Sequence, residues 1–158
     1  MKKDSNYAGA IVLGMHDALV SQTGIITGLT FGLADSRLII FTGVISAVAD
    51  GLSMLASNYL AERERCSPRH AVIAGIYTGV AYLGTSTILI TPFFITRRPI
   101  QALGASVTIA VLIIFLFNLC MARNSKRGVW PRFFEMLGIC VGVSVIAFLV
   151  GEFAKIWL

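Results

Sequence analysis

Charged residues are scarce in this chain. They make up 13% of its 158 residues, whereas hydrophobic residues make up 56%. A soluble domain carries roughly 25% charged residues, so the composition excludes an ordinary soluble fold. Runs of about 20 apolar residues are typical of helices that cross a bilayer. The composition therefore predicts an integral, multi-pass membrane protein surrounded by lipid.

Histidine and cysteine are also rare, with two and three residues. The sequence contains neither the HExxH pattern of zinc peptidases nor the GxSxG turn of serine hydrolases, so we expect no enzyme activity. No CxxC pair is present, and we expect Cys120 and Cys140 to be buried apolar residues. Cys66 and His70 have a C-x3-H spacing, but two isolated ligands do not make a metal site. No permanently bound cofactor is expected.

The net charge is +5, and it raises the question of a nucleic-acid partner. Such a partner would require Lys and Arg clustered on one soluble face, whereas here they lie between apolar runs, so no nucleic acid is expected. Most basic residues fall on one side: Lys2, Lys3, Arg63, Arg65, Arg69, Arg123, Lys126, Arg127 and Arg132. The other side holds Arg37, Arg97, Arg98 and Lys155. The positive-inside rule then predicts a cytoplasmic N-terminus and a C-terminus outside or in a lumen.

Hydropathy divides the chain into five predicted spans, which cover about residues 8–33, 38–61, 71–95, 100–121 and 133–157. The connections between them are short. The prediction is an all-α fold, with residues 1–158 as a single transmembrane domain and no soluble domain. The absence of a targeting peptide suits a prokaryotic cytoplasmic membrane, with a vacuolar membrane as the alternative.

Two carboxylates, Asp17 and Asp50, lie deep within the predicted spans. An ionised carboxylate inside a bilayer is costly, so such residues usually face a partner or a water-filled path. The helical rise places Asp17 roughly 13 Å from the cytoplasmic end of its span, Asp50 roughly 16 Å and Met54 roughly 10 Å. The three side chains are therefore expected at similar depth on two antiparallel helices.

Small and hydroxyl residues accompany these carboxylates. Asp17, Ser21, Gly24 and Gly28 form a stripe, and Gly24, Gly28 and Gly32 are spaced for close helix packing. Asp50 and Met54 share a helix face. Oxygen and thioether donors together favour a borderline transition metal over Mg²⁺.

Packing explanations remain open at three of these positions. Ordinary apolar packing is the alternative explanation for Met54, and a structural pairing with His16 or with a hydroxyl group is the alternative for Asp50. His16 points about 100° away from Asp17 around the helix. It is a candidate second ligand, proton carrier or packing residue.

Two stretches resemble a known family. The segment "DALVSQTGIITGL", which begins at Asp17, is similar to the first-helix signature "DGLVSNFGLVAGV" of the vacuolar iron transporter family. That family is also called the yeast calcium cross-complementer family and includes nodulin-like members. The segment "ADGLSMLASNYLA" is similar to the family's second-helix signature "AGALSMAAGEYLS".

The resemblance implies a homodimer of five-helix subunits, with a metal path between subunits that the first helices line. It also implies that Asp17 and Met54 help to coordinate the transported ion. The family moves Fe²⁺, and often Mn²⁺, out of the cytosol, commonly in exchange for protons.

The chain departs from the family pattern in several places. Ala18 replaces a glycine, Gln22 replaces an asparagine, and Asn58 stands where many members have glutamate. Iron-capturing members carry a Glu- and Met-rich domain between the second and third helices, whereas this chain has only "ERERCSPRH" there. Asp50 is not a carboxylate position of the family.

The resulting hypothesis is an exporter of a divalent transition metal. The ion would enter near Glu62 and Glu64 and pass Asp17, Met54 and Asp50. Ser21, Asn58 and His16 are secondary candidates. The alternative is a membrane scaffold without transport activity, in which the buried carboxylates only fix helix pairing.

Overall fold

The computed structural model describes residues 7–122 and 129–156, and helices account for nearly all of them. In chain order they are α1 (Ala8–Gly32), α2 (Ser36–Arg63), α3 (Pro68–Ile95), α4 (Pro99–Ala122) and α5 (Val129–Ala154). No strand occurs in these described ranges. The predicted all-α fold with five helices is confirmed.

The largest difference from the predicted spans lies in α5, which begins at Val129 rather than near residue 133. Pro131 therefore falls in the first turn of the helix. A proline is tolerated there because the first N–H groups of a helix have no partner within the helix. Pro131 thus lies within the first turn of α5 and does not mark the boundary before the helix.

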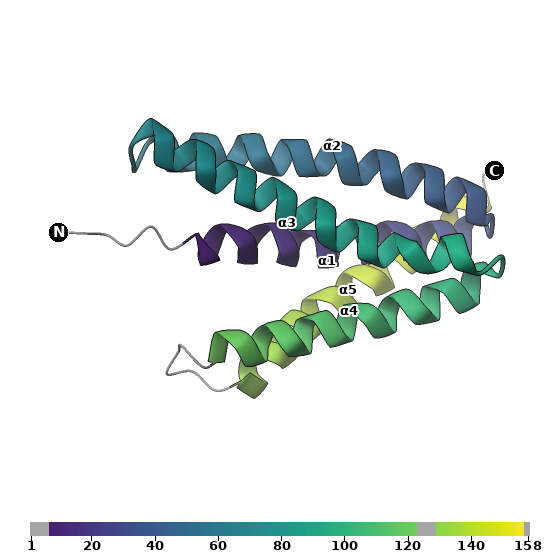
Figure 1. Ribbon diagram of the computed structural model, residues 1–158. Helices are drawn as coiled ribbons and strands as arrows, with labels where there is room; N and C mark the ends of the chain where they lie inside the picture. Colours follow the sequence, from purple (N-terminus) through teal and green to yellow (C-terminus); the bar gives the residue numbers. More distant parts are fainter. Residues whose placement is uncertain (1–6, 123–128, 157–158) are drawn as a thin grey trace.

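The helix α1 lies at the centre of the bundle and contacts each of the other four helices. Figure 1 shows α2 and α3 together on one side of α1, and α4 and α5 on the other. Sequential helices run antiparallel, as the short connections between them require. The central position of α1 brings its polar side chains close to α2 and α3.

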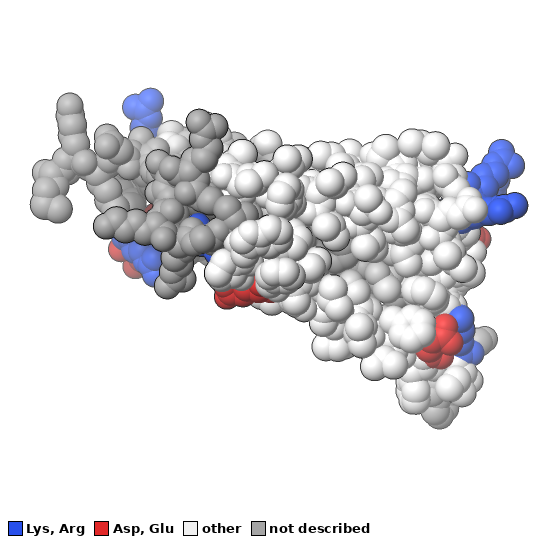
Figure 2. All heavy atoms as spheres, turned by 90° about the horizontal axis from the view of Figure 1, so that it is seen from below, with Lys and Arg blue, Asp and Glu red and all other residues white. Residues whose placement is uncertain are grey.

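All five helices are long and apolar enough to cross a membrane. The shortest has 24 residues, which corresponds to about 36 Å, whereas a hydrocarbon core is about 30 Å thick. Figure 2 shows the coloured charges gathered toward the two ends of the molecule, with an uncharged surface between them. The chain is an integral, multi-pass membrane protein. Several basic residues behind the predicted orientation (Lys2, Lys3, Arg123, Lys126 and Arg127) lie outside the described residues, so the orientation stays a prediction.

Glycines allow the helices to approach closely at two crossings. A side chain at Gly14 would collide with the backbone of Thr78, where α1 crosses α3. A Cβ at Gly75 would lie 2.7 Å from the carbonyl oxygen of Leu55, where α3 packs on α2. These contacts bring α1, α2 and α3 near enough for short polar side chains to bridge them.

The predicted packing stripe of Gly24, Gly28 and Gly32 lies against α5. Ideal Cβ atoms at these positions would meet Val143, Ala147 and Gly151 at 3.0 to 3.5 Å. Gly138 and Gly142 on α5 have the same four-residue spacing, but ideal Cβ atoms there would have no neighbour within 4 Å among the described residues. In this single chain, that pair makes no close helix contact.

The expectation for the cysteines is half right. Cys140 is buried, but Cys120 is exposed. The inner face of α4 near this point is formed by Ile114 and Asn118, both fully or almost fully buried. Because Cys120 follows Asn118 by two residues, or about 200° of helical rotation, it faces outward.

The turn between α1 and α2 contains Ala34 in a left-handed conformation, with φ 53°. The following residue, Asp35, caps α2, because its side chain accepts hydrogen bonds from the backbone N–H of Arg37 (2.7 Å) and of Leu38 (3.4 Å). This cap fixes where α2 starts. The left-handed conformation of Ala34 strains the backbone, and glycine at this position would not have that strain.

We expect Ala34→Gly to stabilise the protein by about 0.5–1 kcal/mol, because the left-handed region is unfavourable for any residue with a Cβ. Thermal unfolding in detergent measures the effect as a raised midpoint. Ala105→Gly, at an exposed position inside α4, is the matched control and should lower the midpoint. An unchanged or lowered midpoint for Ala34→Gly would contradict the strain argument.

Candidate functional site

Asp50 is the point at which three helices meet through side chains. Its Oδ2 accepts a hydrogen bond from the hydroxyl of Tyr82 on α3 (3.0 Å) and one from Ser21 on α1 (3.5 Å). The Asp50 side chain is half-buried and Tyr82 is fully buried. Both donors reach the same oxygen, and no hydrogen bond to Oδ1 occurs within the described residues. Asp50 is therefore held in place and still has one oxygen available to a ligand.

Asp17 lies on α1, one helical turn before Ser21. It is half-buried and interacts electrostatically with Asp50 and with His16. Within residues 7–122 and 129–156, no group donates a hydrogen bond to its carboxylate. Two carboxylates in mutual electrostatic range inside an apolar bundle repel one another, and a cation beside them would offset that repulsion.

Met54 follows Asp50 by one turn on α2 and is half-buried. Because α1 and α2 are antiparallel and Ser21 lies opposite Asp50, one turn further along α2 corresponds to one turn earlier on α1. Met54 is thus at the level of Asp17. The structure brings Asp17, Ser21 and Asp50 together and places the thioether one turn from Asp50.

The sequence reasoning missed two polar residues of this cluster, Gln22 and Ser46. Gln22 is fully buried, and its Nε2 donates a hydrogen bond to Ser46 Oγ on α2 (3.3 Å). Its Oε1 is buried and accepts no hydrogen bond in the described part of the chain. Ser46 precedes Asp50 by one turn of α2. The unsatisfied carbonyl oxygen of Gln22 therefore lies about one turn from the Asp50 carboxylate. Gln22 was singled out in the sequence only as a departure from the family pattern.

Tyr82 was missed as well. Its only sequence signal is a hydroxyl-bearing aromatic residue among the small and polar residues of "GVAYLGTST". That signal does not identify a partner on another helix. Only the crossing of α3 with α2 brings the hydroxyl to Asp50.

Asn58, a secondary candidate, has a packing role in this structure. Its Nδ2 donates to Thr78 Oγ1 (2.6 Å) and to the carbonyl oxygen of Ala74 (3.2 Å) on α3. The Thr78 hydroxyl also reaches the carbonyl oxygen of Ala10 on α1 (3.1 Å). The amide nitrogen of Asn58 therefore belongs to a second group of hydrogen bonds that joins α1, α2 and α3, nearer one end of the bundle.

The two glutamates at the end of α2 have different surroundings. Glu64 is exposed, whereas Glu62 is half-buried beside Cys66 and His70. The sequence pattern paired Cys66 with His70 and left Glu62 out. The structure makes the set one of three potential ligands, because the turn folds α3 back onto the end of α2.

A groove of about 560 Å³ runs along α1 and α5. Its lining is mostly apolar and includes Gly24, Gly28 and Gly151 together with Ser21. Since Ser21 donates to Asp50, the groove lies next to the carboxylate cluster. This surface of α1 is open in the single chain.

The comparisons with known proteins agree with the resemblance read from the two helix signatures. Residues 8–71 match the VIT family, the vacuolar iron transporters. The matched region contains Asp17, Asp50 and Met54. An uncharacterized protein of Methanocaldococcus jannaschii is 25% identical over an alignment of 166 positions, gaps included, which spans 89% of this chain and 86% of that protein. The family resemblance is confirmed over α1, α2 and the start of α3.

We expect Tyr82→Phe to destabilise the fold by about 1–2 kcal/mol, because it removes a hydrogen bond to a half-buried carboxylate. Thermal unfolding in detergent measures this loss. Tyr77→Phe removes the same group from the same helix, where Tyr77 is 43% exposed and stacks on Tyr7. It should leave the midpoint unchanged. Equal midpoints for both variants would show that the bond to Asp50 contributes nothing to stability.

Proposed function

We propose that this chain is a transporter that carries a divalent transition metal ion, Fe²⁺ or Mn²⁺, out of the cytosol. The premise is the family match, which indicates membrane transport of a metal ion rather than catalysis. One observation carries the proposal: carboxylates from α1 and α2 share a polar cluster inside an apolar five-helix bundle. A divalent cation would neutralise both charges at once.

The groups around the two carboxylates suit an ion that moves through. Asp17 accepts no hydrogen bond within the described residues, so its oxygens are available as ligands. Asp50 is oriented by Tyr82 and Ser21 through Oδ2 alone, which leaves Oδ1 to face an ion. The thioether of Met54 adds a soft donor at the level of Asp17. Oxygen and sulfur donors together favour Fe²⁺ and Mn²⁺ over Mg²⁺ and Ca²⁺.

Proton exchange follows from the same chemistry. When the ion leaves, two neighbouring carboxylates in an apolar layer repel one another, and binding a proton removes a charge. Asp17 is the proposed proton acceptor, because it has no hydrogen-bond donor in the described part of the chain. His16, the adjacent residue on α1, adds a second group that can bind a proton.

A homodimer would complete the path. The groove beside Ser21 leaves one face of α1 open, and the α1 helices of two copies facing each other there would enclose the ion between two sets of carboxylates. A polar path exposed to lipid would be costly, since a bilayer core offers no hydrogen bonds. The dimer interface would cover it.

The direction of transport depends on the orientation of the chain. We propose a cytoplasmic N-terminus, with residues 1–158 as one transmembrane domain in a prokaryotic cytoplasmic membrane. The excess of Lys and Arg at the N-terminal end supports this orientation. Export from the cytosol then means movement from the end that holds Glu62 toward the end that holds Asp35.

A scaffold without transport activity is the alternative. The hydrogen bonds from Ser21 and Tyr82 to Asp50 favour it, because a carboxylate that joins three helices stabilises the bundle whether or not an ion binds. Asp17 distinguishes the two functions, because its carboxylate accepts no hydrogen bond from the described residues. A purely structural role gives no reason for a charge at this position.

We expect Asp17→Asn to lower the initial rate of Mn²⁺ and Fe²⁺ uptake into proteoliposomes at least about tenfold, which corresponds to a loss of about 1.4 kcal/mol. The substitution keeps the size of the side chain and removes one ligand charge. Size-exclusion chromatography checks that the variant is folded. Imposing a pH gradient on the same vesicles tests proton exchange. If metal moves in exchange for protons, the wild-type uptake rate should change with the gradient.

Glu152→Gln is the control for the loss of a carboxylate. The Glu152 side chain is 43% exposed and pairs with Lys155 (2.7 Å) near the C-terminal end of α5, so this variant should transport at the wild-type rate. Wild-type rates in a folded Asp17→Asn protein would support the scaffold and reject transport through Asp17.

We expect Met54→Leu to keep the fold and to reduce the preference for Mn²⁺ over Ca²⁺ several-fold. The volume is conserved, but the soft donor that disfavours hard ions is lost. Competition of Ca²⁺ with Mn²⁺ uptake measures the preference. Met15→Leu is the matched control, because Met15 packs against the apolar core around Leu19. If both variants keep the wild-type preference, Met54 is a packing residue.

A further inference from the structure

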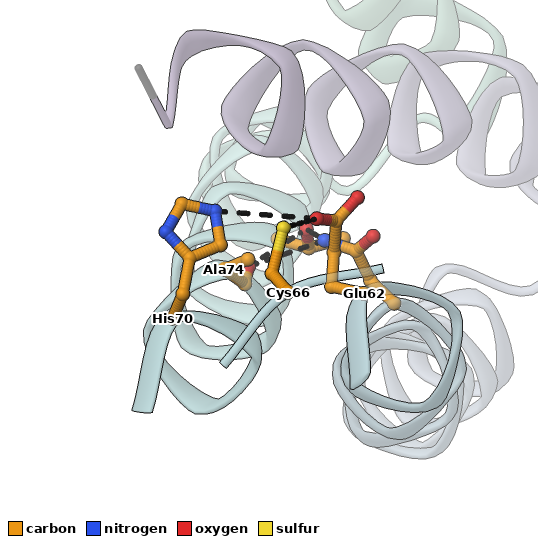
Figure 3. Close-up of polar contacts among 6 residues, drawn as sticks. Glu62, Cys66, His70 and Ala74 are labelled. Atoms are coloured by element: carbon orange, nitrogen blue, oxygen red, sulfur yellow. Dashed lines mark hydrogen bonds and ion pairs between the residues drawn. The ribbon is translucent and has the colours of Figure 1, made fainter. Parts of the chain in front are cut away.

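Three potential metal ligands gather at the turn between α2 and α3. Glu62 comes from the last turn of α2, Cys66 from the turn itself and His70 from the first turn of α3. Their ligand atoms all lie within 4.8 Å of one another, and all three residues are half-buried. Figure 3 shows the thiol and the imidazole directed toward the carboxylate.

The distances are close to those of a metal site. Cys66 Sγ lies 3.6 Å from Glu62 Oε2, and His70 Nε2 lies 4.0 Å from the same oxygen. In a tetrahedral zinc site, bonds of about 2.3 Å to sulfur and about 2.0–2.2 Å to nitrogen and oxygen separate the ligand atoms by about 3.4–3.6 Å. Small side-chain rotations would therefore close the three ligands around one ion.

The backbone of the turn sets this arrangement. The N–H groups of Cys66 (2.8 Å) and Arg65 (3.1 Å) both donate to the carbonyl oxygen of Glu62. The next helix starts at once, because Pro68 occupies its first turn, where no backbone N–H is needed. Cys66 is thus fixed beside the glutamate, and His70 follows it on α3.

The imidazole of His70 is held by an aromatic stack. Its ring lies 4.8 Å from the ring of Tyr7, which in turn stacks on Tyr77 at 5.1 Å. This stack orients the ring so that Nε2 faces Glu62. Groups that orient a ligand in this way raise metal affinity. Arg63, next to Glu62 in the sequence, lies over the ring of Tyr59 and donates a hydrogen bond to its hydroxyl (3.2 Å), rather than pairing with Glu62.

We propose that Glu62, Cys66 and His70 bind a divalent metal ion of the borderline class, such as Zn²⁺, Co²⁺ or Fe²⁺, with water as the fourth ligand. A thiolate and an imidazole exclude Mg²⁺ and Ca²⁺, which require oxygen ligands. Binding releases the thiol proton to solvent, because the thiolate is the ligand. Three protein ligands and one water leave the site open to exchange, unlike a closed four-ligand structural site.

The position of the site suggests that it receives the ion that the membrane path carries, and this role rests on the proposed function. Met54, Asn58 and Glu62 follow one another at intervals of four residues on α2. Glu62 is therefore about 12 Å along the helix from Met54. An ion that leaves the turn would reach the thioether of Met54 after about two turns of α2, and Asp50 one turn further along the helix.

Titration of the purified wild-type protein with Co²⁺, under reducing conditions in detergent, tests the site directly. We expect one equivalent to bind and to give a sulfur-to-cobalt charge-transfer band in the near ultraviolet, which Zn²⁺ abolishes by displacement. Cys66→Ser should remove the band. Glu62→Gln and His70→Ala should each weaken binding at least about tenfold, because each removes one of three protein ligands.

Matched controls separate the site from other thiols and carboxylates. Cys120→Ser removes the exposed cysteine on α4, and Glu135→Gln removes an exposed carboxylate on α5. Both should bind Co²⁺ as the wild type does. If a substitution in the turn disrupts folding, Zn²⁺ protection of Cys66 from maleimide in the Cys120→Ser protein replaces it, because Cys140 is buried. A missing band, or a band that persists in Cys66→Ser, would overturn the site.

Flux measurements distinguish failure of this site from failure of transport. If the turn receives the ion, Cys66→Ser should raise the Fe²⁺ concentration needed for half-maximal uptake and leave the maximal rate unchanged. Co²⁺ binding together with unaltered uptake would keep the metal site and reject its role in transport. Absent Co²⁺ binding, with uptake that still depends on Asp17, would reject the site and leave the transport proposal intact.

Discussion

The hydrogen bonds to Asp50 are the interaction on which the arrangement of the first three helices depends. A carboxylate within an apolar layer requires donors from the protein, since the bilayer core provides none. Its Oδ2 finds them on α1 and α3, in Ser21 and Tyr82. Polar side chains bridge helices only where the backbones approach closely; Gly14 allows α1 to approach α3, and Gly75 allows α3 to approach α2. The same meeting brings Asp17 into electrostatic range of Asp50.

One helix, α2, connects the two proposed metal-binding regions. Asp50 and Met54 lie within the apolar layer, and Glu62 lies at the end of the helix beside Cys66 and His70. The chemistry differs between them. The turn combines sulfur, nitrogen and oxygen in a half-buried position open to exchange, whereas the inner cluster consists mainly of carboxylates and one thioether. In the proposed path, an ion entering the bilayer would leave sulfur and nitrogen ligands and bind charged carboxylates. Their negative charge would compensate that of the ion where an unpaired charge is most costly.

Local patterns in the sequence predicted those features that depend on neighbouring residues. The spans followed from apolar runs, and the expectation of similar depth for Asp17, Asp50 and Met54 followed from the helical rise. Features that depend on contacts between distant residues were missed or misjudged. Tyr82 lies 32 residues from the carboxylate it bonds, and the exposure of Cys120 depends on which face of α4 packs inward. Asn58 was a candidate ligand by its position, and its amide proved to join α2 to α3.

The sequence by itself determined that the chain has five membrane-crossing helices and that two carboxylates lie inside them, because hydropathy and helical rise are local properties. It also supplied the family resemblance through two helix signatures. Only the tertiary structure decided which groups satisfy those carboxylates and that Glu62 joins Cys66 and His70. Hydrogen bonds and ligand sets form between residues that the helix crossings and the turn bring together, and no periodicity along the chain specifies those crossings.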